Sequence, residues 1–394
     1  MAQFGDFTVD RNSTKYVLGS GGTIISYATD EPAFEFNADG SYKGLLVEPA
    51  ATNLLKYSEE FDEAVWTKAP GVSVTANTDV APDGTTTADT VTSGANQIDQ
   101  AVSCSTSTTY TDSLYFKKTT GATYTPGMYL IFTGGTFIIY AVVLNTDTGV
   151  ATAVSAGGFT TPDAFSVSDQ GDYWRLSITG SSGNNTTVSL RLYPNLNTAG
   201  GSGAGSQIVW GAQLETGPIA TSYIPTTTAS VTRAKDDITL ASASSLIGQT
   251  EGTLYIEVDW RRASGQTQGL LFVSGTATPN ENRIQIEAND PTSKLSMIVR
   301  ISGTTEVFQG QSFSGYSGIQ KIAFAYANQD FELYRNGSSI SSDTVGSLAA
   351  LGTLTDIDLG QAYNTNNQAN MWIRAVALYP TRLSDSEAEA LTTL

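Results

Sequence analysis

The chain has 394 residues, of which 40% are hydrophobic and only 15% are charged, and 38 acidic against 20 basic side chains give a formal net charge of −18. Phosphate binding requires clustered lysine and arginine, and the basic residues here form no run, so the charge balance argues against nucleic acid as a partner. The chain contains no histidine, which excludes Ser-His-Asp and Cys-His catalysis and histidine-ligated zinc.

The start of the chain and its hydropathy predict where the protein is made. The first residues contain neither a basic nor an apolar stretch, so no secretory signal is expected. No segment approaches the roughly 18 apolar residues of a membrane span. The sequence therefore predicts synthesis in a cytoplasm, without membrane insertion. The single cysteine, Cys104, cannot form an internal disulfide, so we expect stability to be independent of redox state.

Residues 1–55 alternate short apolar pieces with glycine and aspartate turns. Residues 34–36 and 44–47 are predicted to be brief strands, and Pro49 ends the second. Strands this short cannot bury a core alone. We therefore expect an N-terminal docking segment that packs on the next domain and anchors the protein to a larger particle. Four leucines are expected to close that next domain: Leu45, Leu46, Leu54 and Leu55.

Residues 56–235 carry strand signals of period two. Apolar and polar residues alternate in 113–117, 173–178, 188–192 and 208–214, and turn-rich pieces of glycine, serine and asparagine separate the strands. Such alternation puts one face of each strand in a core and leaves the other face wet. This region is therefore predicted to be an antiparallel sandwich or jelly roll.

Residues 236–394 repeat the alternation, most clearly in 254–260, 295–301 and 322–334. Asn336 and Gly337 both tolerate the positive φ of a type I′ turn, so they predict a hairpin. Ser384 and Glu387 form a capping box, which predicts a short C-terminal helix. For the whole chain the predicted fold class is all-β, with two antiparallel β-sandwich domains and this one short helix.

Two stretches resemble a module of tailed-phage particle proteins. One is GLLVEPAATNLL at 44–55, followed by 57–61 and 66–68. The other is WGAQLE at 210–215, followed by TSYIPT at 221–226 and VTRA at 231–234. The resemblance implies that the first domain is a carbohydrate-binding jelly roll of the kind found in tail fibres, head spikes and related appendages.

The second domain is similar to the concanavalin A-like, or laminin G-like, sandwich. Four stretches carry this similarity: 322–326, 333–337, 357–360 and 373–379, the last followed by Leu383-Ser384-Asp385. Because this fold hosts lectins, enzymes and passive spacers, the similarity implies a fold but no function.

A glycoside hydrolase needs two carboxylates about 5 to 10 Å apart. Glu257 and Asp259 point the same way on one predicted strand. The laminarinase-like enzymes on this fold carry a third carboxylate, and here Arg262 occupies its place. We therefore favour a solvated strand face over a catalytic pair, and we expect no enzyme activity.

Two kinds of binding site are worth weighing. A structural calcium ion would suit Asp356 and Asp358 with Asn364 and Asn366, or Asp79 with Asp83, although plain turn chemistry explains both groups. Glycan binding combines an aromatic platform with polar side chains, although most aromatic residues of sandwiches belong to the core. The candidate glycan-binding residues are Tyr193 with Asn195, and Trp372 with Asn367 and Asn370.

The combined prediction is a structural protein at the surface of a bacteriophage particle, such as a fibre, a spike or a decoration on head or tail. It would present glycan-binding sandwiches for adhesion to the host surface. The implied partners are other virion proteins, host cell-surface glycans and further copies of the chain in a homotrimer. Two alternatives stay open: a capsid cement protein without a ligand, and a capsule polysaccharide depolymerase.

Overall fold

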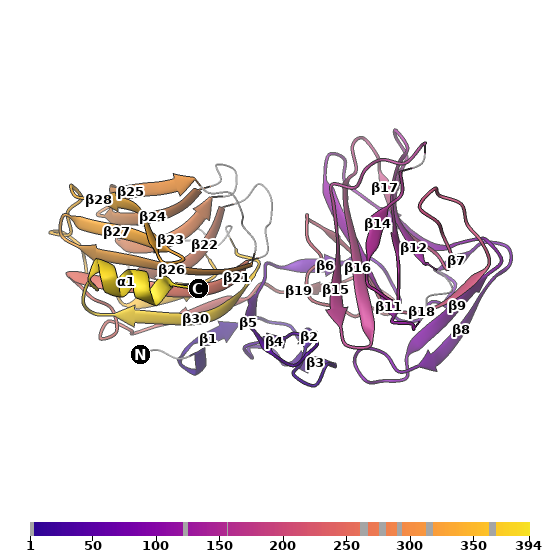
Figure 1. Ribbon diagram of the computed structural model, residues 1–394, viewed down its shortest axis with the longest axis horizontal. Helices are drawn as coiled ribbons and strands as arrows, with labels where there is room; N and C mark the ends of the chain where they lie inside the picture. Colours follow the sequence, from indigo (N-terminus) through magenta and orange to yellow (C-terminus); the bar gives the residue numbers. More distant parts are fainter. Residues whose placement is uncertain are drawn as a thin grey trace.

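The computed structural model describes residues 4–120, 125–155, 157–260, 267–275, 281–289, 294–312, 318–361 and 368–394. In this part of the chain β-strands dominate, and they form two lobes that each contain two stacked sheets (Figure 1). The all-β prediction is confirmed. No helix in the described ranges is long and apolar enough to cross a membrane.

The first lobe, which we call the jelly roll, stacks two six-stranded antiparallel sheets. We name each sheet after a central strand. The β11 sheet has the order β15-β16-β11-β18-β9-β8, and the β12 sheet has the order β14-β13-β12-β17-β10-β7. Their strands are β7 (Thr67–Lys68), β8 (Val72–Asp79), β9 (Ala88–Ser93), β10 (Ile98–Ser103), β11 (Thr109–Lys117), β12 (Gly127–Thr133), β13 (Ile138–Leu144), β14 (Ala151–Ala153), β15 (Ala164–Gln170), β16 (Tyr173–Ser181), β17 (Thr187–Tyr193) and β18 (Gly205–Thr216).

Strand β11 shows how alternation builds this lobe. Tyr110, Leu114 and Phe116 lie in the core between the two sheets. Ser113 and Tyr115, at the odd positions, face the other side of the β11 sheet, where Tyr115 packs in a separate cluster. The two-residue period of the sequence therefore decides which side chains are core and which form the outer face.

The second lobe, which we call the C-terminal sandwich, stacks two seven-stranded sheets. The β21 sheet has the order β28-β27-β26-β21-β30-β5-β4, and the β22 sheet has the order β1-β20-β29-β22-β23-β24-β25. The strands from this half of the chain are β20 (Asp237–Leu240), β21 (Glu251–Trp260), β22 (Thr267–Ser274), β23 (Arg283–Asn289), β24 (Lys294–Ile301), β25 (Thr304–Ser312), β26 (Gly318–Ala327), β27 (Asp330–Arg335), β28 (Ser338–Asp343), β29 (Asp356–Leu359) and β30 (Met371–Tyr379).

Two local signals of this lobe are confirmed. Asn336 and Gly337 have φ values of 49° and 82° and turn β27 into β28. Helix α1 (Asp385–Thr392) begins with the capping box, in which the backbone N–H of Ser384 donates to the Glu387 carboxylate at 2.9 Å. The helix packs on the outer face of the β21 sheet through Ala388.

The N-terminal segment requires a correction, because its strands do not all pack on the next domain. Strands β1 (Thr8–Asp10), β4 (Phe34–Phe36) and β5 (Tyr42–Val47) join the sheets of the C-terminal sandwich. Leu45 lies in that sandwich's core and Leu46 beside it, whereas only Leu55 and the partly buried Leu54 pack in the jelly roll.

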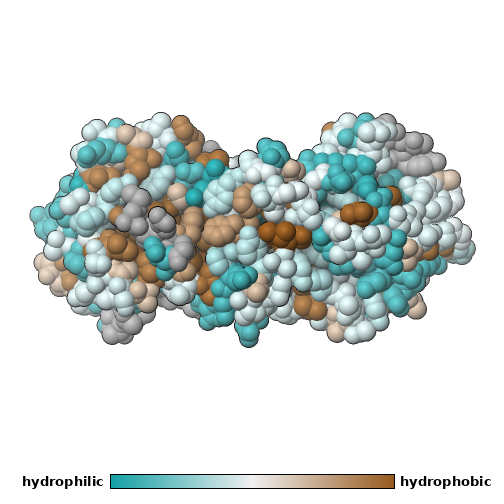
Figure 2. All heavy atoms as spheres, turned by 90° about the horizontal axis from the view of Figure 1, so that it is seen from below, coloured by the Kyte–Doolittle hydropathy of each residue, from teal (hydrophilic) through white to brown (hydrophobic). Residues whose placement is uncertain are grey.

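The same segment also contacts the jelly roll. The hairpin of β2 (Lys15–Leu18) and β3 (Ile24–Tyr27) packs Leu18 and Ile24 against Tyr115, Tyr173 and Trp210 of the β11 sheet. The first 55 residues therefore bridge both lobes, as Figure 1 shows. On the face drawn in Figure 2, apolar residues form small separate patches among polar ones.

The two phage-like stretches meet between the lobes. Strand β6 (Ala51–Asn53) pairs with β19 (Val231–Arg233), and the Asn53 amide donates to Ala212 O at 3.0 Å and to Ile224 O at 2.9 Å. The Glu48 carboxylate accepts the backbone N–H of Ser222 at 2.8 Å. The two stretches that carry the resemblance, 44–55 and 210–234, therefore connect the two sandwiches in this structure.

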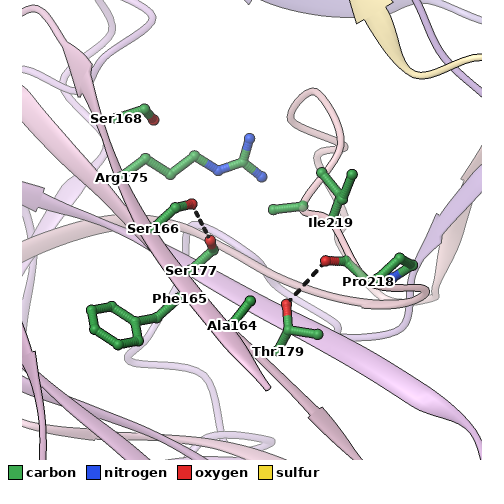
Figure 3. Close-up of a pocket in the computed structure, with 10 residues that line it drawn as sticks. Ala164, Phe165, Ser166, Ser168, Arg175, Ser177, Thr179, Pro218 and Ile219 are labelled. Carbon is green, nitrogen blue, oxygen red and sulfur yellow. Dashed lines mark hydrogen bonds between the residues drawn. The ribbon is translucent and has the colours of Figure 1, made fainter. Parts of the chain in front are cut away.

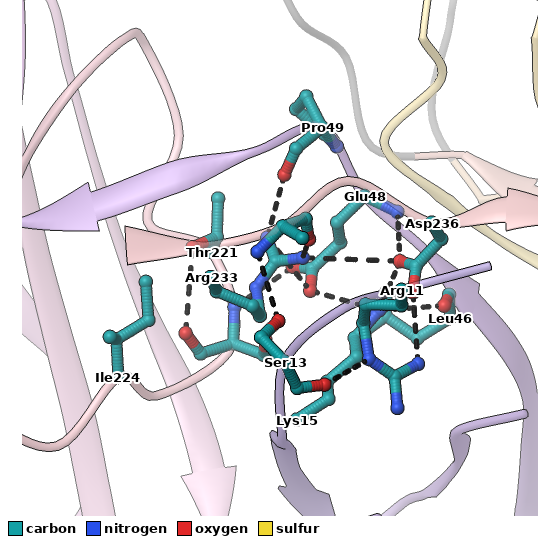
Figure 4. Close-up of polar contacts among 12 residues, drawn as sticks. Arg11, Ser13, Lys15, Leu46, Glu48, Pro49, Thr221, Ile224, Arg233 and Asp236 are labelled. Atoms are coloured by element: carbon teal, nitrogen blue, oxygen red, sulfur yellow. Dashed lines mark hydrogen bonds and ion pairs between the residues drawn. The ribbon is translucent and has the colours of Figure 1, made fainter. Parts of the chain in front are cut away.

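Five buried charged side chains sit at this connection, which we call the joint (Figure 4): Arg11, Lys15, Glu48, Arg233 and Asp236. The Lys15 ammonium lies 2.6 Å from Asp236 and 3.2 Å from Glu48. Arg11 lies 3.1 Å from Asp236, and Arg233 lies 3.5 Å from Glu48. Each cation meets a carboxylate inside the protein, as buried charges must.

Candidate functional site

A candidate site lies on the outer face of the β11 sheet, at its β15 edge. Strands β15 and β16 run antiparallel there, with Ser166 opposite Ser177 and Ser168 opposite Arg175. Period-two alternation turns all four side chains away from the jelly-roll core. The segment 218–220, which follows β18, forms the opposite wall (Figure 3).

Between these walls is a pocket of about 280 Å³, which we call the seam pocket. It lies just below the range of about 300–1,000 Å³ that is typical of small-molecule sites. Hydroxyl groups line one side, and Pro218, Ile219 and Ala220 give the other side an apolar surface. In Figure 3, Ile219 faces Arg175 across the pocket, whereas the Phe165 ring points away from it.

Arg175 is only 8% exposed and is held by neutral groups. Its Nε and Nη2 donate to Ser113 Oγ at 3.3 and 2.9 Å, and Nη1 donates to Thr221 O at 2.7 Å. The guanidinium also stacks over the Tyr115 ring, 5.2 Å from its centroid. A guanidinium carries five N–H donors, so two of them remain after these three bonds.

A buried carboxylate, that of Glu215, lies near enough to Arg175 for their charges to interact. Glu215 accepts hydrogen bonds from Thr221 N at 2.9 Å, Thr221 Oγ1 at 2.5 Å and Gln213 Nε2 at 2.6 Å. Burial raises the pKa of Glu215, and these hydrogen bonds, together with the nearby charge of Arg175, partly offset the rise. The hydrogen bonds of Glu215 fix the segment 217–224 against the sheet, so they shape the pocket wall.

The hydroxyl groups of the pocket can form hydrogen bonds with a polar ligand. Ser166 Oγ lies 2.8 Å from Ser177 Oγ, whereas Thr179 Oγ1 is held between Pro218 O at 3.2 Å and Thr111 Oγ1 at 2.8 Å. Hydroxyls both donate and accept, so those of Ser166 and Ser177 can rotate toward the hydroxyl groups of a ligand. A pocket with several hydroxyls, one cation and one apolar wall suits a polyhydroxylated molecule with an exposed C–H face.

The seam pocket continues along the same face. A narrow space between the N-terminal segment and the jelly roll shares Ser168 and Arg175 with it, and also reaches Gln170. Gln170 in turn lines a wider cleft of about 580 Å³ between the β2–β3 turn and the loops at 80–84 and 169–173. In that cleft the Lys118 ammonium lies 2.6 Å from Asp169 and 4.0 Å from the centroid of the Trp174 ring.

The predicted glycan pair Tyr193 and Asn195 lies on the outer face of the other sheet, the β12 sheet. The structure does bring these residues together, but both are partly engaged. The Tyr193 ring lies 5.0 Å from the Tyr129 ring, and the Asn195 amide donates to Ala204 O at 2.9 Å. The pair therefore remains a prediction, on the opposite side of the jelly roll from the seam pocket.

The prediction that Trp372 is a sugar platform requires correction. Its side chain is 5% exposed, its Nε1 donates to Glu35 at 2.8 Å, and the Lys43 ammonium covers the ring at 3.8 Å. The N-terminal segment thus occupies the surface on which a sugar would stack. Asn370 is 4% exposed, and Asn367 lies outside the described residues.

The predicted calcium ligands are occupied by protein donors. Asp358 accepts from Gln361 at 3.2 Å, and the same amide bonds Asp237 at 2.6 Å. Burial and the charge of Asp237 raise the pKa of Asp358 to about 7. Asp356 accepts from Ser242 N at 3.3 Å.

The second pair of predicted calcium ligands also contacts protein groups. Asp79 pairs with Lys117, and Asp83 accepts a hydrogen bond from the Thr85 N–H. Asn364 and Asn366 lie outside the described residues. Among the residues that are described, no three acidic, cysteine or histidine side chains are placed to hold a metal ion.

The carboxylates weighed for hydrolysis are also engaged in part. Glu257 pairs with Arg374 at 2.8 Å, and the Tyr255 hydroxyl lies 3.4 Å from the same carboxylate. Asp259, two residues further on the strand, is partly buried, and Arg262 lies outside the described part.

The residues of the seam pocket were not recognised from the sequence. The sequence places Arg175 and Ser177 only on the wet face of a predicted strand. The available signal was a lone arginine among serine and threonine at alternating positions in 164–179. That signal does not reveal the wall at 218–220, which is supplied by a distant segment.

No known family model matches the chain, and no curated protein matches it. Among solved structures, the CBM40 domain of the Ruminococcus gnavus IT-sialidase is similar over 39% of this chain and 88% of its own, with 18% identity and a TM-score of 0.33. The NanB sialidase of Streptococcus pneumoniae is similar over 39% of this chain and 26% of its own, with 16% identity and a TM-score of 0.33.

A heptameric SAP-like pentraxin from Limulus polyphemus is similar over 35% of this chain and 68% of its own, with 9% identity and a TM-score of 0.30. Likenesses of this kind concern the fold alone, and no ligand follows from them.

Proposed function

We propose that this protein is a structural component of a bacteriophage particle whose jelly roll binds a saccharide of the host surface. The observation that carries the binding function is the seam pocket. Its hydroxyls, from Ser166 and Ser177, match the hydroxyl groups of a sugar, and its apolar wall matches a C–H face.

The particle role is supported by the phage-like stretches at 44–55 and 210–234. Their buried contacts hold the two sandwiches together, and a fixed two-lobed body suits an appendage that projects from a particle. We place the protein at the virion surface, with other virion proteins and further copies of itself, in a homotrimer, as partners. Residues 1–55 bridge both lobes, so in this proposal the surface that docks to the particle is formed by the assembled lobes rather than by this segment alone.

We propose further that the protein does not cleave its ligand. Glu257, one of the two candidate carboxylates, is paired with Arg374. The measurement is the chain length of host capsule polysaccharide after incubation with purified protein. Reproducible shortening that is abolished by Glu257→Gln would favour the depolymerase instead.

Saccharide binding is tested on a glycan array and by titration of the best ligand. Ser166→Ala removes one hydroxyl from the pocket, and we expect a loss of about fivefold in affinity, since one hydrogen bond contributes about 1 kcal/mol. Ser73→Ala on the exposed side of β8 is the matched control and should bind as the parent does. A parent protein that binds no glycan would favour a cement protein without a ligand.

A further inference from the structure

We infer that the seam pocket selects a carboxylate-bearing saccharide, and that Arg175 is the residue that recognises the carboxylate. This inference rests on the proposed saccharide-binding function and names its ligand class. It is carried by three observations: the charge of the pocket, the pairing of the buried arginine and the donors that this arginine keeps.

The charge of the pocket is opposite to that of the protein. Arg175 is the one charged side chain among the described residues that line the pocket; the others are serine, threonine, alanine, phenylalanine, proline and isoleucine. The whole chain carries a formal charge of −18. Long-range attraction therefore does not bring an anion to this surface, and charges are screened beyond about 8 Å at physiological salt. An anion would have to be recognised by direct contact inside the pocket.

Arg175 differs in its partners from Arg11 and Arg233, the two buried arginines of the joint. Arg11 and Arg233 each lie within ion-pair distance of a carboxylate in the joint. In the described part of the chain, Arg175 forms no ion pair, and its acceptors are a hydroxyl, a carbonyl and an aromatic ring face. Buried charges are normally paired, so a guanidinium held only by neutral groups at the wall of an open pocket is suited to an anionic ligand.

The remaining donors of Arg175 fit this role. After its three hydrogen bonds, one N–H is left on each terminal nitrogen. Hydrogen bonds from a guanidinium to a carboxylate are about twice as strong as neutral ones. The bonds to Ser113 and Thr221 fix the side chain before the ligand arrives, so little conformational entropy is lost on binding.

Glu215 does not cancel this preference. Its carboxylate accepts hydrogen bonds from Thr221 and Gln213, and Glu215 is not among the residues that line the pocket. Its charge weakens the field of Arg175 but occupies none of the remaining donors. The pocket thus offers an anion two N–H groups, neighbouring hydroxyls for the sugar ring and an apolar wall for its C–H face.

The test compares acids with their own methyl esters, which differ chiefly in charge. The probes are glucuronate, galacturonate and N-acetylneuraminate, each titrated at neutral pH by NMR alongside its ester. We expect at least one acid to bind the parent protein tenfold or more tighter than its ester. Arg175→Gln should reduce that acid to the affinity of the ester, and Arg175→Lys should keep part of the preference. Arg191→Gln, on the opposite face of the jelly roll, is the matched control.

The outcomes separate the two proposals. Equal affinity for acid and ester overturns the inference and leaves saccharide binding intact. Binding of neutral saccharides alone has the same consequence. Absence of binding to every saccharide, on the array and by NMR, overturns the proposed function as well. The comparison of acid with ester uses the parent protein, so it does not depend on the folding of any Arg175 variant.

Discussion

The joint and the seam pocket both place arginine in the interior, but they complete its surroundings in different ways. In the joint, Arg11 and Arg233 meet the carboxylates of Asp236 and Glu48, and the cluster is closed to solvent. In the pocket, Arg175 meets a hydroxyl, a carbonyl and a ring, and a cavity lies beside it. The pairing of the buried arginines thus distinguishes the joint from the pocket that we propose as a binding site.

The largest effect is expected from breaking the joint. Asp236→Asn leaves three buried cations with the single carboxylate of Glu48. Removal of one partner from a buried ion pair typically costs about 3–5 kcal/mol, because the remaining charges stay buried. The measurement is the free energy of unfolding in urea. The exposed Asp147→Asn should change it by less than about 0.5 kcal/mol. A similarly small change for Asp236→Asn would show that the joint contributes little to stability.

The jelly-roll core contains a buried acid that forms no ion pair among the described residues. Asp112 faces the jelly-roll core beside Ile178 and Leu214, and neither of its carboxylate oxygens has a hydrogen-bond partner. Burial raises the pKa of Asp112 well above its ordinary value. The folded state therefore holds this proton more tightly than the unfolded state does. The stability that this bound proton contributes is fully present below the pKa of Asp112 in the unfolded chain. It is lost as the pH rises through the raised pKa of the folded state.

The corresponding experiment is urea unfolding between about pH 4 and pH 9. For one proton the loss of stability has a slope of up to about 1.4 kcal/mol per pH unit. The Asp112→Asn side chain cannot ionise, so the variant's plot of unfolding free energy against pH should lack this slope. Above the unfolded-state pKa of Asp112, stability should therefore change with pH in favour of the variant. Parallel curves for the two proteins would contradict the protonated, unpaired state of Asp112.

The smallest effect is expected from reduction. Cys104 is a partly buried free thiol, 3.5 Å from Asn185 O. Because the lobes are held by burial and paired charges rather than by a covalent bond, the melting temperature should be the same with and without reductant. A fall of several degrees would indicate a Cys104–Cys104 bridge between copies of the chain.

Local signals predicted the strands that show the clearest alternation. Alternation marked β11, β16 and β21, and the Asn336-Gly337 turn and the Ser384 capping box were placed correctly. Pairings across long sequence distances were not predictable, since Thr8 faces Thr239 and Leu46 faces Trp372. The short strands of residues 1–55 show no sequence preference for one partner sheet. The sequence therefore does not predict that β1, β4 and β5 join the sheets of the C-terminal sandwich.

The candidate site was harder to predict for the same reason. Trp372 carries the residue type of a sugar platform, but a segment more than 300 positions earlier in the chain covers it. Arg175 looks like any arginine on a wet strand face, and its lack of a carboxylate partner is a property of the folded chain. Composition and period therefore predict faces, whereas the pairing of charges emerges only in three dimensions.

The assignment of the seam pocket is best tested by a crystal structure of the protein soaked with the acidic sugar that binds best. We predict the sugar in the seam pocket, with its carboxylate within hydrogen-bond distance of Arg175 and its ring against Ile219. A sugar bound instead beside Tyr193, on the β12 sheet, or on the C-terminal sandwich would contradict the assignment of the site.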